Sequence, residues 1–151
     1  MEKRYPLNNS STLFRKISES LKRGDTPCLI TGLSPAAKAF FIGALSDEHF
    51  PAAVVCRDEA EALRLLCDLE TLFGEGSTAL IPARDFNFRS GEISSKEYEL
   101  SRLSALYKIT RKNLRFAVFS AECALQPIIP ENIFLENIKT ISEGETFPPE
   151  D

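Results

Sequence analysis

The stretch Cys28-Leu-Ile-Thr-Gly-Leu-Ser-Pro-Ala-Ala-Lys38-Ala39 decides the fold, because an apolar run meets a glycine and then opens a helical segment. In this strand-to-helix context, the pattern G-x-x-x-x-G-K-S/T cradles phosphate and magnesium. Gly32 and Lys38 match the pattern. Ala37, however, stands where a second glycine admits the phosphate, and Ala39 stands where a hydroxyl holds magnesium. The sequence therefore predicts a phosphate-loop fold whose loop is degenerate and binds no nucleotide.

Composition indicates a single ordinary globular domain. Of the 151 residues, 43% are hydrophobic and 26% are charged, which suffices for one apolar core. The net charge of -4 argues against a surface built throughout for nucleic acid, so such binding would need a local basic patch. No apolar run approaches the roughly 20 residues of a membrane helix. Residues 1–6 also lack the apolar core of a signal peptide, so we expect a cytoplasmic protein without membrane contact.

The cysteines give no sign of a disulfide framework or a metal site. Cys28, Cys56, Cys67 and Cys123 form no C-x-x-C pair, and His49 is the one histidine of the chain. We expect reduced, mostly buried thiols.

Apolar runs alternate with segments of helical periodicity along most of the chain. Strands are predicted at residues 28–31, 52–56, 77–81, 115–119 and 137–141, with Pro127 and Pro130 interrupting the chain before the last of them. This alternation is typical of an α/β fold, here a parallel sheet of about five strands with helices on both faces, RecA-like and related to the P-loop NTPases. We expect an N-terminal helix in residues 1–24, the domain in residues 25–142, and in residues 143–151 a linker towards a following domain.

Two of the predicted helices have identifiable ends and faces. Asp58 and Glu61 form a capping box, and the apolar stripe that follows them ends at Gly74. A later helix begins near Ser94. It is predicted to bury, in part, Tyr98, Leu100, Leu103, Leu106 and Tyr107.

Several segments resemble the bacterial transcription-repair coupling factors, Mfd. They are the run from Leu29 through the loop, Ala53-Val-Val-Cys56 with its capped helix, Leu80-Ile-Pro-Ala-Arg-Asp-Phe86, Val118-Phe-Ser-Ala-Glu-Cys-Ala-Leu-Gln126 and Ile138-Lys-Thr-Ile-Ser-Glu-Gly-Glu145. The most specific segment is Leu100-Ser-Arg-Leu-Ser-Ala-Leu-Tyr107. The resemblance covers most of residues 25–147. It is to the N-terminal module of that family, which is similar to the first domain of the excision-repair protein UvrB.

The resemblance implies a UvrB-like domain 1A without catalytic parts. UvrB has an intact phosphate loop and, after its third strand, a long hairpin that inserts into DNA; residues 84–94 are too few for such a hairpin here. In that family the next domain carries most of the surface that recruits UvrA, and domains far downstream use ATP and magnesium. The resemblance therefore implies a cofactor-free scaffold that supports UvrA recruitment at stalled RNA polymerase. It also implies that other domains of the full-length protein make the contacts with the polymerase and DNA.

Two groups of residues are candidates for a partner or DNA contact. The first comprises Arg84, Phe86, Phe88 and Arg89, and the second comprises Lys108, Arg111, Lys112 and Arg115. Aromatic and basic residues alternate in the first group, which suits stacking on bases or gripping a partner, although the rings can equally anchor the loop. The second group is either a small patch that faces nucleic acid or a set of cations that favours the C-terminal end of a helix.

Three functional hypotheses follow from these observations. The first is the non-catalytic domain that the resemblance implies. The second is an NTPase or helicase-type domain that still binds ATP through Lys38. The third is a DNA-binding module that uses the two basic groups, which the net charge makes less favourable. The acidic run Asp58-Glu-Ala-Glu61 resembles a helicase box, but helix capping accounts for both end residues, and a single histidine leaves no plausible Ser/His/Asp triad.

Overall fold

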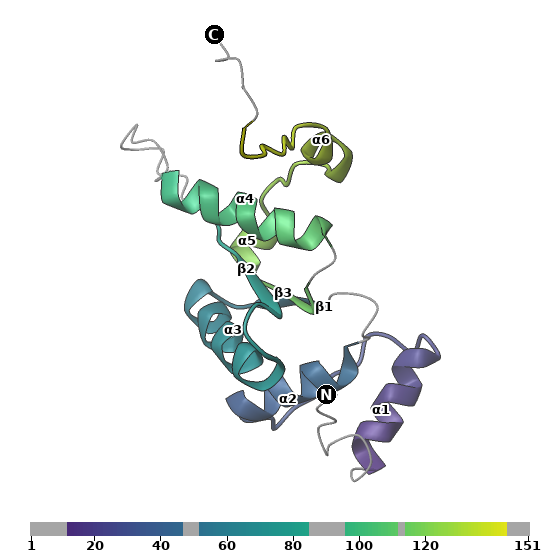
Figure 1. The fold of residues 1–151 in the computed structure, drawn as a ribbon. Coiled ribbons are helices and arrows are strands. Elements are labelled where there is room, and N and C mark those ends of the chain that lie inside the picture. The colour runs from purple at the N-terminus through teal and green to yellow at the C-terminus, as the bar shows by residue number, and fades with distance from the viewer. Residues whose placement is uncertain (1–11, 47–51, 85–95, 112–113, 145–151) are drawn as a thin grey trace.

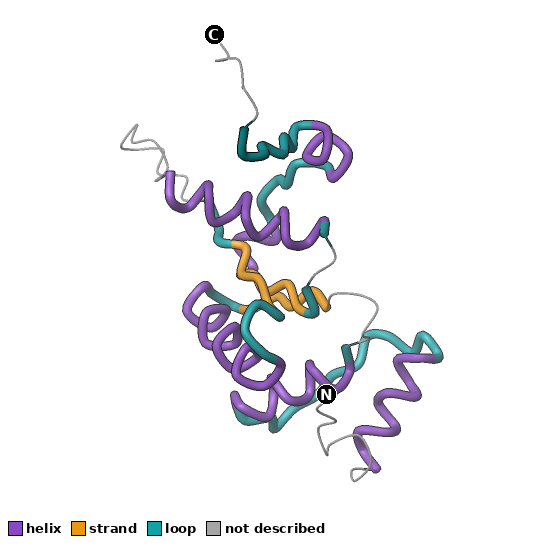
Figure 2. Tube along the Cα trace, viewed as in Figure 1, coloured by secondary structure: helices purple, strands orange, loops and turns teal. Residues whose placement is uncertain are grey.

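The computed structural model describes residues 12–46, 52–84, 96–111 and 114–144, and its centre is a three-stranded parallel sheet (Figure 1). The strands are β1 (Ala52–Cys56), β2 (Thr78–Ile81) and β3 (Phe116–Ser120), in the order β1-β3-β2. The helices are α1 (Thr12–Lys22), α2 (Pro35–Leu45), α3 (Glu59–Phe73), α4 (Lys96–Thr110), α5 (Ala121–Ala124) and α6 (Glu131–Glu136). α2 and α3 lie on one side of the sheet and α4 on the other (Figure 2). The predicted class, a mixed α/β fold with a parallel sheet, is confirmed.

The central strand β3 joins the two halves of the core, since both other strands pair with it. Ala52 of β1 and Thr78 of β2 both lie opposite Phe116. Because side chains alternate along a strand, each face of the sheet has its own apolar cluster. The cluster under α2 and α3 contains Ala39, Cys56, Ala62, Leu65, Leu69, Phe116 and Val118. The cluster under α4 contains Ala79, Ile81, Ala105, Leu114 and Cys123.

The sheet has three strands where about five are predicted, so the described residues are not plainly RecA-like. Residues 28–31 do not join the sheet, and Leu29 is 90% exposed. α2, which follows this run, packs chiefly on α3, and the run stays at the surface on that outer side. Among the described residues, no strand pairs with this apolar run.

The fifth predicted strand, residues 137–141, is also wrong. Asn137 instead ends α6, its side-chain amide donating to the carbonyl of Ile133 (2.8 Å). The N–H of Ile138 then donates to the carbonyl of Leu135 (3.3 Å). The sequence does not predict α6, because Pro130 suggests an interruption of the chain. A proline at a helix start is nevertheless favourable, since its missing N–H would have no partner there.

The two faces of β1 are unequally buried. Ala52 and Val54 pack on the α2–α3 cluster, whereas Val55, which faces the other way, is 56% exposed. α4 packs against β2, at the far edge of the sheet, and among the described helices only the short α5 approaches β1 on the side away from α2 and α3.

α3 forms as its sequence predicts. The carboxylate of Asp58 accepts the N–H of Glu61 (2.8 Å), which satisfies one of the free donors of the first turn. Ala62, Leu65 and Leu69 form the buried stripe, and Gly74 ends the helix with a φ of 101° that other residues rarely adopt.

α4 turns a different face to the core from the one predicted. Arg102 and Ala105 are its buried residues, with exposed fractions of 3% and 4%. Of the five residues predicted to be partly buried, Leu106 packs on the core, whereas Tyr98, Leu100, Leu103 and Tyr107 are all at least 40% exposed. The small side chain of Ala105 lets the helix approach the sheet closely. Arg102 donates hydrogen bonds to the carbonyls of Pro82 and Pro127. Leu100 and Leu103 consequently lie on the outer face.

The thiols and the lengths of the helices bear on two further predictions. Cys56 and Cys123 are buried, but Cys28 and Cys67 are exposed, and all four are free thiols. The prediction of mostly buried thiols therefore holds for half of them. Within the described ranges, none of the helices combines the length and apolarity needed to cross a membrane.

Arg115 fastens α2 and α3 to the sheet. Its guanidinium donates to the carbonyl of Gly43 (2.7 Å) and the hydroxyl of Ser46 (2.9 Å), and it lies 4.4 Å from the ring centroid of Phe73. The Phe73 ring in turn packs at 5.2 Å from that of Phe116. Gly43 is buried against this ring, and a Cβ at that position would collide with it.

We predict that Gly43→Ala destabilises the protein by about 1–3 kcal/mol, because the added methyl overpacks the contact with Phe73. This sign is the reverse of the usual preference for Ala over Gly in a helix interior, which is about 1 kcal/mol. Urea unfolding followed by circular dichroism measures the difference.

Phe73→Leu supplies the matched background, because it shortens the side chain that the added methyl would meet. Gly43→Ala should be much less destabilising in that background. A stabilised single variant would contradict the close approach of α2 to α3.

Candidate functional site at the carboxyl edge of the sheet

The carboxyl ends of the three parallel strands lie at one edge of the sheet, which is where ligands bind in folds of this type. β1 is followed there by Arg57 and Asp58, β2 by Pro82 to Arg84, and β3 by α5. Lys38 reaches the β1 end of this edge through Glu61. The edge therefore gathers the phosphate-loop lysine and Arg84, and we take it as the candidate site.

The degenerate loop is built as a helix cap. The hydroxyl of Ser34 accepts the N–H of Ala37 (3.3 Å), and Pro35, the first residue of α2, has no N–H to offer. Gly32 keeps a φ of 81°, as the turn requires. Ala39, at the position of the magnesium-binding hydroxyl, is fully buried in the core. Two of the backbone donors that would face a phosphate are thus missing or used.

The ammonium group of Lys38 is held by a carboxylate of the chain itself. Its Nζ lies 3.0 Å from Oε1 of Glu61, and the other carboxylate oxygen accepts the N–H of Arg57 (3.2 Å). The Lys38 side chain is 49% exposed, and exposed ion pairs contribute only roughly 0–1 kcal/mol, so the pair orients Lys38 more than it stabilises the fold. Glu61 therefore competes with any added anion for the ammonium group of Lys38.

Hydrogen bonds to Lys38 and to the N–H of Arg57 lower the pKa of Glu61. The pKa of Asp58 is also lowered, first by the N–H of Glu61 and then by the Arg57 side chain. Both groups are therefore carboxylates at neutral pH and belong to the cap of α3. At the end of β1, burial raises the pKa of the Cys56 thiol, which disfavours the nucleophilic thiolate.

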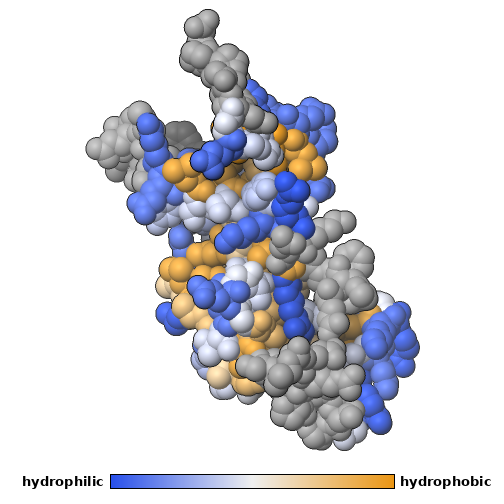
Figure 3. Space-filling model, in the orientation of Figure 1, coloured by the Kyte–Doolittle hydropathy of each residue, from blue (hydrophilic) through white to orange (hydrophobic). Residues whose placement is uncertain are grey.

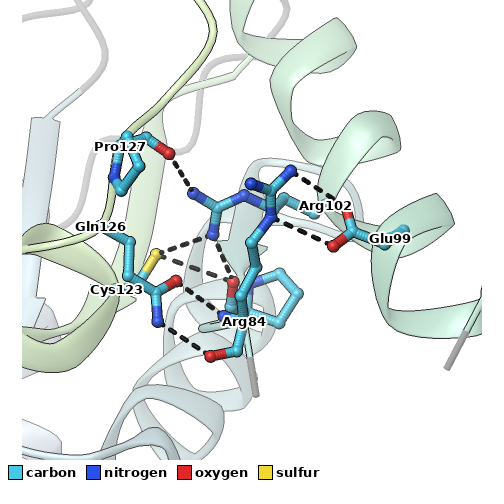
Figure 4. Close-up of polar contacts among 7 residues, drawn as sticks. Arg84, Glu99, Arg102, Cys123, Gln126 and Pro127 are labelled. Carbon is cyan, nitrogen blue, oxygen red and sulfur yellow. Dashed lines mark hydrogen bonds and ion pairs between the residues drawn. The ribbon is translucent and has the colours of Figure 1, made fainter. Parts of the chain in front are cut away.

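At the β2 end of the edge, a buried arginine joins three segments (Figure 4). Nη1 of Arg102 donates to the carbonyl of Pro82 (2.8 Å) and lies 3.4 Å from the sulfur of Cys123. Nη2 donates to the carbonyl of Pro127 (3.4 Å). No carboxylate within the described ranges forms an ion pair with Arg102, so neutral acceptors hold this buried charge.

Both the backbone and the side chain of Arg84 are held by polar contacts. The side-chain amide of Gln126 accepts the N–H of Arg84 (2.7 Å) and donates to its carbonyl (2.9 Å), as a neighbouring strand would. The guanidinium meets Glu99 of α4, with Nη2 donating to Oε2 (3.3 Å). Nε lies 3.1 Å from Oε1, an ion-pair contact without the geometry of a hydrogen bond.

The structure separates the other candidate residues. Lys108 and Arg111 lie at the exposed end of α4, where Arg111 stacks on Tyr107 at 5.2 Å. Arg115 points to α2, on the opposite side of the sheet. Phe86, Phe88, Arg89 and Lys112 lie outside the described residues, as does His49. A contact of either group with DNA or a partner stays a prediction.

Among the described residues, no group of three or more His, Cys, Asp or Glu side chains is arranged to hold a metal ion. Sequence reasoning misses Arg102, Gln126 and the role of Glu61 as the partner of Lys38. A helical face through residues 102, 105, 106 and 109 does carry a signal, because Ala105, Leu106 and Ile109 share it with the arginine. That pattern is less apolar than the neighbouring one formed by Tyr98, Leu100, Leu103 and Tyr107, which therefore dominates a prediction from hydropathy.

The chain is thus a small parallel α/β domain whose phosphate-loop position carries a helix cap. Among curated proteins it is similar to the transcription-repair-coupling factor of Bacillus subtilis (strain 168), with 22% identity over 138 residues. The match covers 91% of this chain and 12% of that protein, so the chain spans about an eighth of its relative. It confirms the resemblance drawn from the motifs. No protein-family model and no solved structure matches the chain.

We predict that the double variant Asp58→Asn and Glu61→Gln loses an acid-dependent part of stability. Both carboxylates have lowered pKa values, so their contribution is complete above the ordinary values of 3.8 and 4.5. It is lost as the pH falls through the lower values of the folded protein. Thermal midpoints measured between about pH 2.5 and pH 7 should differ from wild type at neutral pH and converge in acid. A difference that is the same at both ends would contradict this assignment.

We predict that Arg102→Ala destabilises the domain by about 2–5 kcal/mol, because it leaves the carbonyls of Pro82 and Pro127 without a donor and opens a cavity. Arg102→Lys keeps the charge but cannot span both carbonyls, so its loss should be smaller. Arg111→Ala, on the exposed end of the same helix, is the control and should change stability by less than about 0.5 kcal/mol. Equal losses for the variants at positions 102 and 111 in urea unfolding would refute the role of Arg102.

Proposed function

We propose that this chain is a non-catalytic domain of a transcription-repair coupling factor. In this role it supports an adjoining domain that recruits UvrA when RNA polymerase stalls at damaged DNA. The similarity to the Bacillus subtilis protein supports the family assignment. The relative is a transcription-repair-coupling factor by name, and the part played by this domain within such a protein is our inference.

One observation carries the non-catalytic part of the proposal: Lys38 is paired with Glu61 in a loop that serves as a helix cap. A working loop needs free backbone donors, a lysine that faces the phosphates and a hydroxyl on magnesium. Here Ser34 takes one donor, the carboxylate takes the lysine, and the hydroxyl position is a buried alanine. Competition from an internal carboxylate and the absence of the hydroxyl weaken nucleotide binding together.

Calorimetric titration with ATP and magnesium tests this part. We expect no saturable binding by the wild type. We also expect none by Glu61→Ala, which frees Lys38 but restores neither the second glycine nor the hydroxyl. Lys38→Ala is the matched control. A dissociation constant below about 10 μM in the wild type, equivalent to roughly 7 kcal/mol, that is lost in Lys38→Ala would overturn the proposal in favour of the NTPase hypothesis.

A hybrid protein tests the scaffold role. In the Bacillus subtilis relative, the matched segment is replaced by this chain, and capture of UvrA by the immobilised hybrid is measured. We expect the hybrid to capture UvrA and the isolated chain not to do so, because the recruiting surface is proposed to lie on the adjoining domain. Equal capture by the isolated chain would place that surface here instead.

A further inference from the structure

An apolar groove lies between α4 and α6. It has a volume of about 530 Å³, and its walls include Leu100, Leu103 and Tyr107 from α4 and Ile129, Ile133 and Ile138 from the α6 region. Leu100 is 66% exposed and Ile133 is 47% exposed. Hydrophobic side chains reach the surface over this part of the molecule in Figure 3. We call it the α4–α6 groove.

The charge next to the groove is mostly acidic on the α6 side, where Lys139, directly after the groove-lining Ile138, is the exception. Residues 121–136 contain three glutamates, Glu122, Glu131 and Glu136, and no lysine or arginine. All three glutamates are exposed. A helix that fits this wall should therefore combine an apolar stripe with basic side chains beside it.

α1 has this combination. Phe14, Ile17 and Leu21 recur at helical spacing on one face of this strongly amphipathic helix. Arg15, Lys16 and Lys22 are exposed, and the one acidic residue of the helix, Glu19, pairs with Arg15 (3.7 Å), so the helix keeps a net positive charge. At eleven residues it is about 16 Å long. Helix-in-groove recognition uses anchors at this spacing.

The groove and α1 lie at opposite ends of the molecule. Figure 1 shows α1 beside α2, on the far side of the sheet from α4 and α6. There Phe14 makes an edge-to-face contact with Phe41 at 5.5 Å. The segment that joins α1 to α2, residues 23–34, is exposed for most of its length.

We propose that α1 of one copy of this chain binds the α4–α6 groove of a second copy. The two surfaces are different, so the contact closes as a dimer when the two copies exchange their helices reciprocally, and otherwise it extends head to tail. In either arrangement Phe14 leaves its contact with Phe41 and packs in the groove of the other copy. The basic side chains of α1 then face the glutamates of the α6 wall.

Sedimentation velocity from about 1 to about 200 μM tests self-association, a range that brackets a dissociation constant near 10 μM. We expect wild type to associate and Ile133→Glu to associate at least about tenfold more weakly, because it buries a charge in the groove. Leu63→Glu is the matched control. It places the same charge at a leucine of α3 that is also 47% exposed, and should associate as wild type does.

Charge reversal distinguishes this partner from any other. The double variants Lys16→Glu with Lys22→Glu, and Glu131→Lys with Glu136→Lys, should each be monomeric at concentrations where wild type associates. Mixed together they should associate again, since each α1 then meets a groove of opposite charge. Circular dichroism checks that each variant is folded. A wild type that stays monomeric throughout, or a mixture that does not associate, would overturn the proposal; the first result is also the one expected if α1 binds the groove of its own chain or leaves it to another protein.

Discussion

The guanidinium of Arg102 connects three parts of the chain that no strand pairing joins: the segment after β2, the helix α4 and the turn after α5. Because its partners are carbonyls and a thiol, the charge is compensated by dipoles alone among the described residues. A buried guanidinium held in this way needs each of its acceptors in place, so the position of one segment fixes that of the others. The rotation of α4 follows, since Arg102 can reach these acceptors only when the leucine-rich face turns outwards.

At the β1 end of the carboxyl edge of the sheet, the charged groups pair with one another. Arg57 is exposed and Lys38, Asp58 and Glu61 are partly exposed, and their contacts organise a helix start without adding much stability. Lys38 pairs here with Glu61, whose other carboxylate oxygen accepts the N–H of Arg57 just before α3. Gly32 and Ser34 form the turn and the cap that begin α2, and the ammonium group of Lys38 binds a carboxylate.

Sequence alone predicts those parts of the fold that short-range patterns specify. The cap and stripe of α3 and the three central apolar runs are all local features, and the structure contains them. The failures are non-local. Residues 28–31 are as apolar as a strand, yet pairing depends on a neighbour that hydropathy does not reveal. The orientation of α4 depends on acceptors some twenty residues away on either side of Arg102 in the sequence, and the clamp on Arg84 depends on Gln126. Counting apolar residues cannot detect a buried cation or a side-chain amide that takes the place of a strand.

The position of β3 in the sheet has a consequence for how the chain is made. Both other strands pair only with β3 in the described sheet, and β3 is the last of the three to leave the ribosome. β1 and β2 can therefore form no native strand pair until residue 120 has been synthesised and released from the exit tunnel. During that interval α3 can form, because its cap and its apolar stripe are local features. β1 and β2 have not yet met the strand with which they pair, so their apolar side chains stay exposed. Nascent chains that stop short of this strand would be the natural clients of a chaperone.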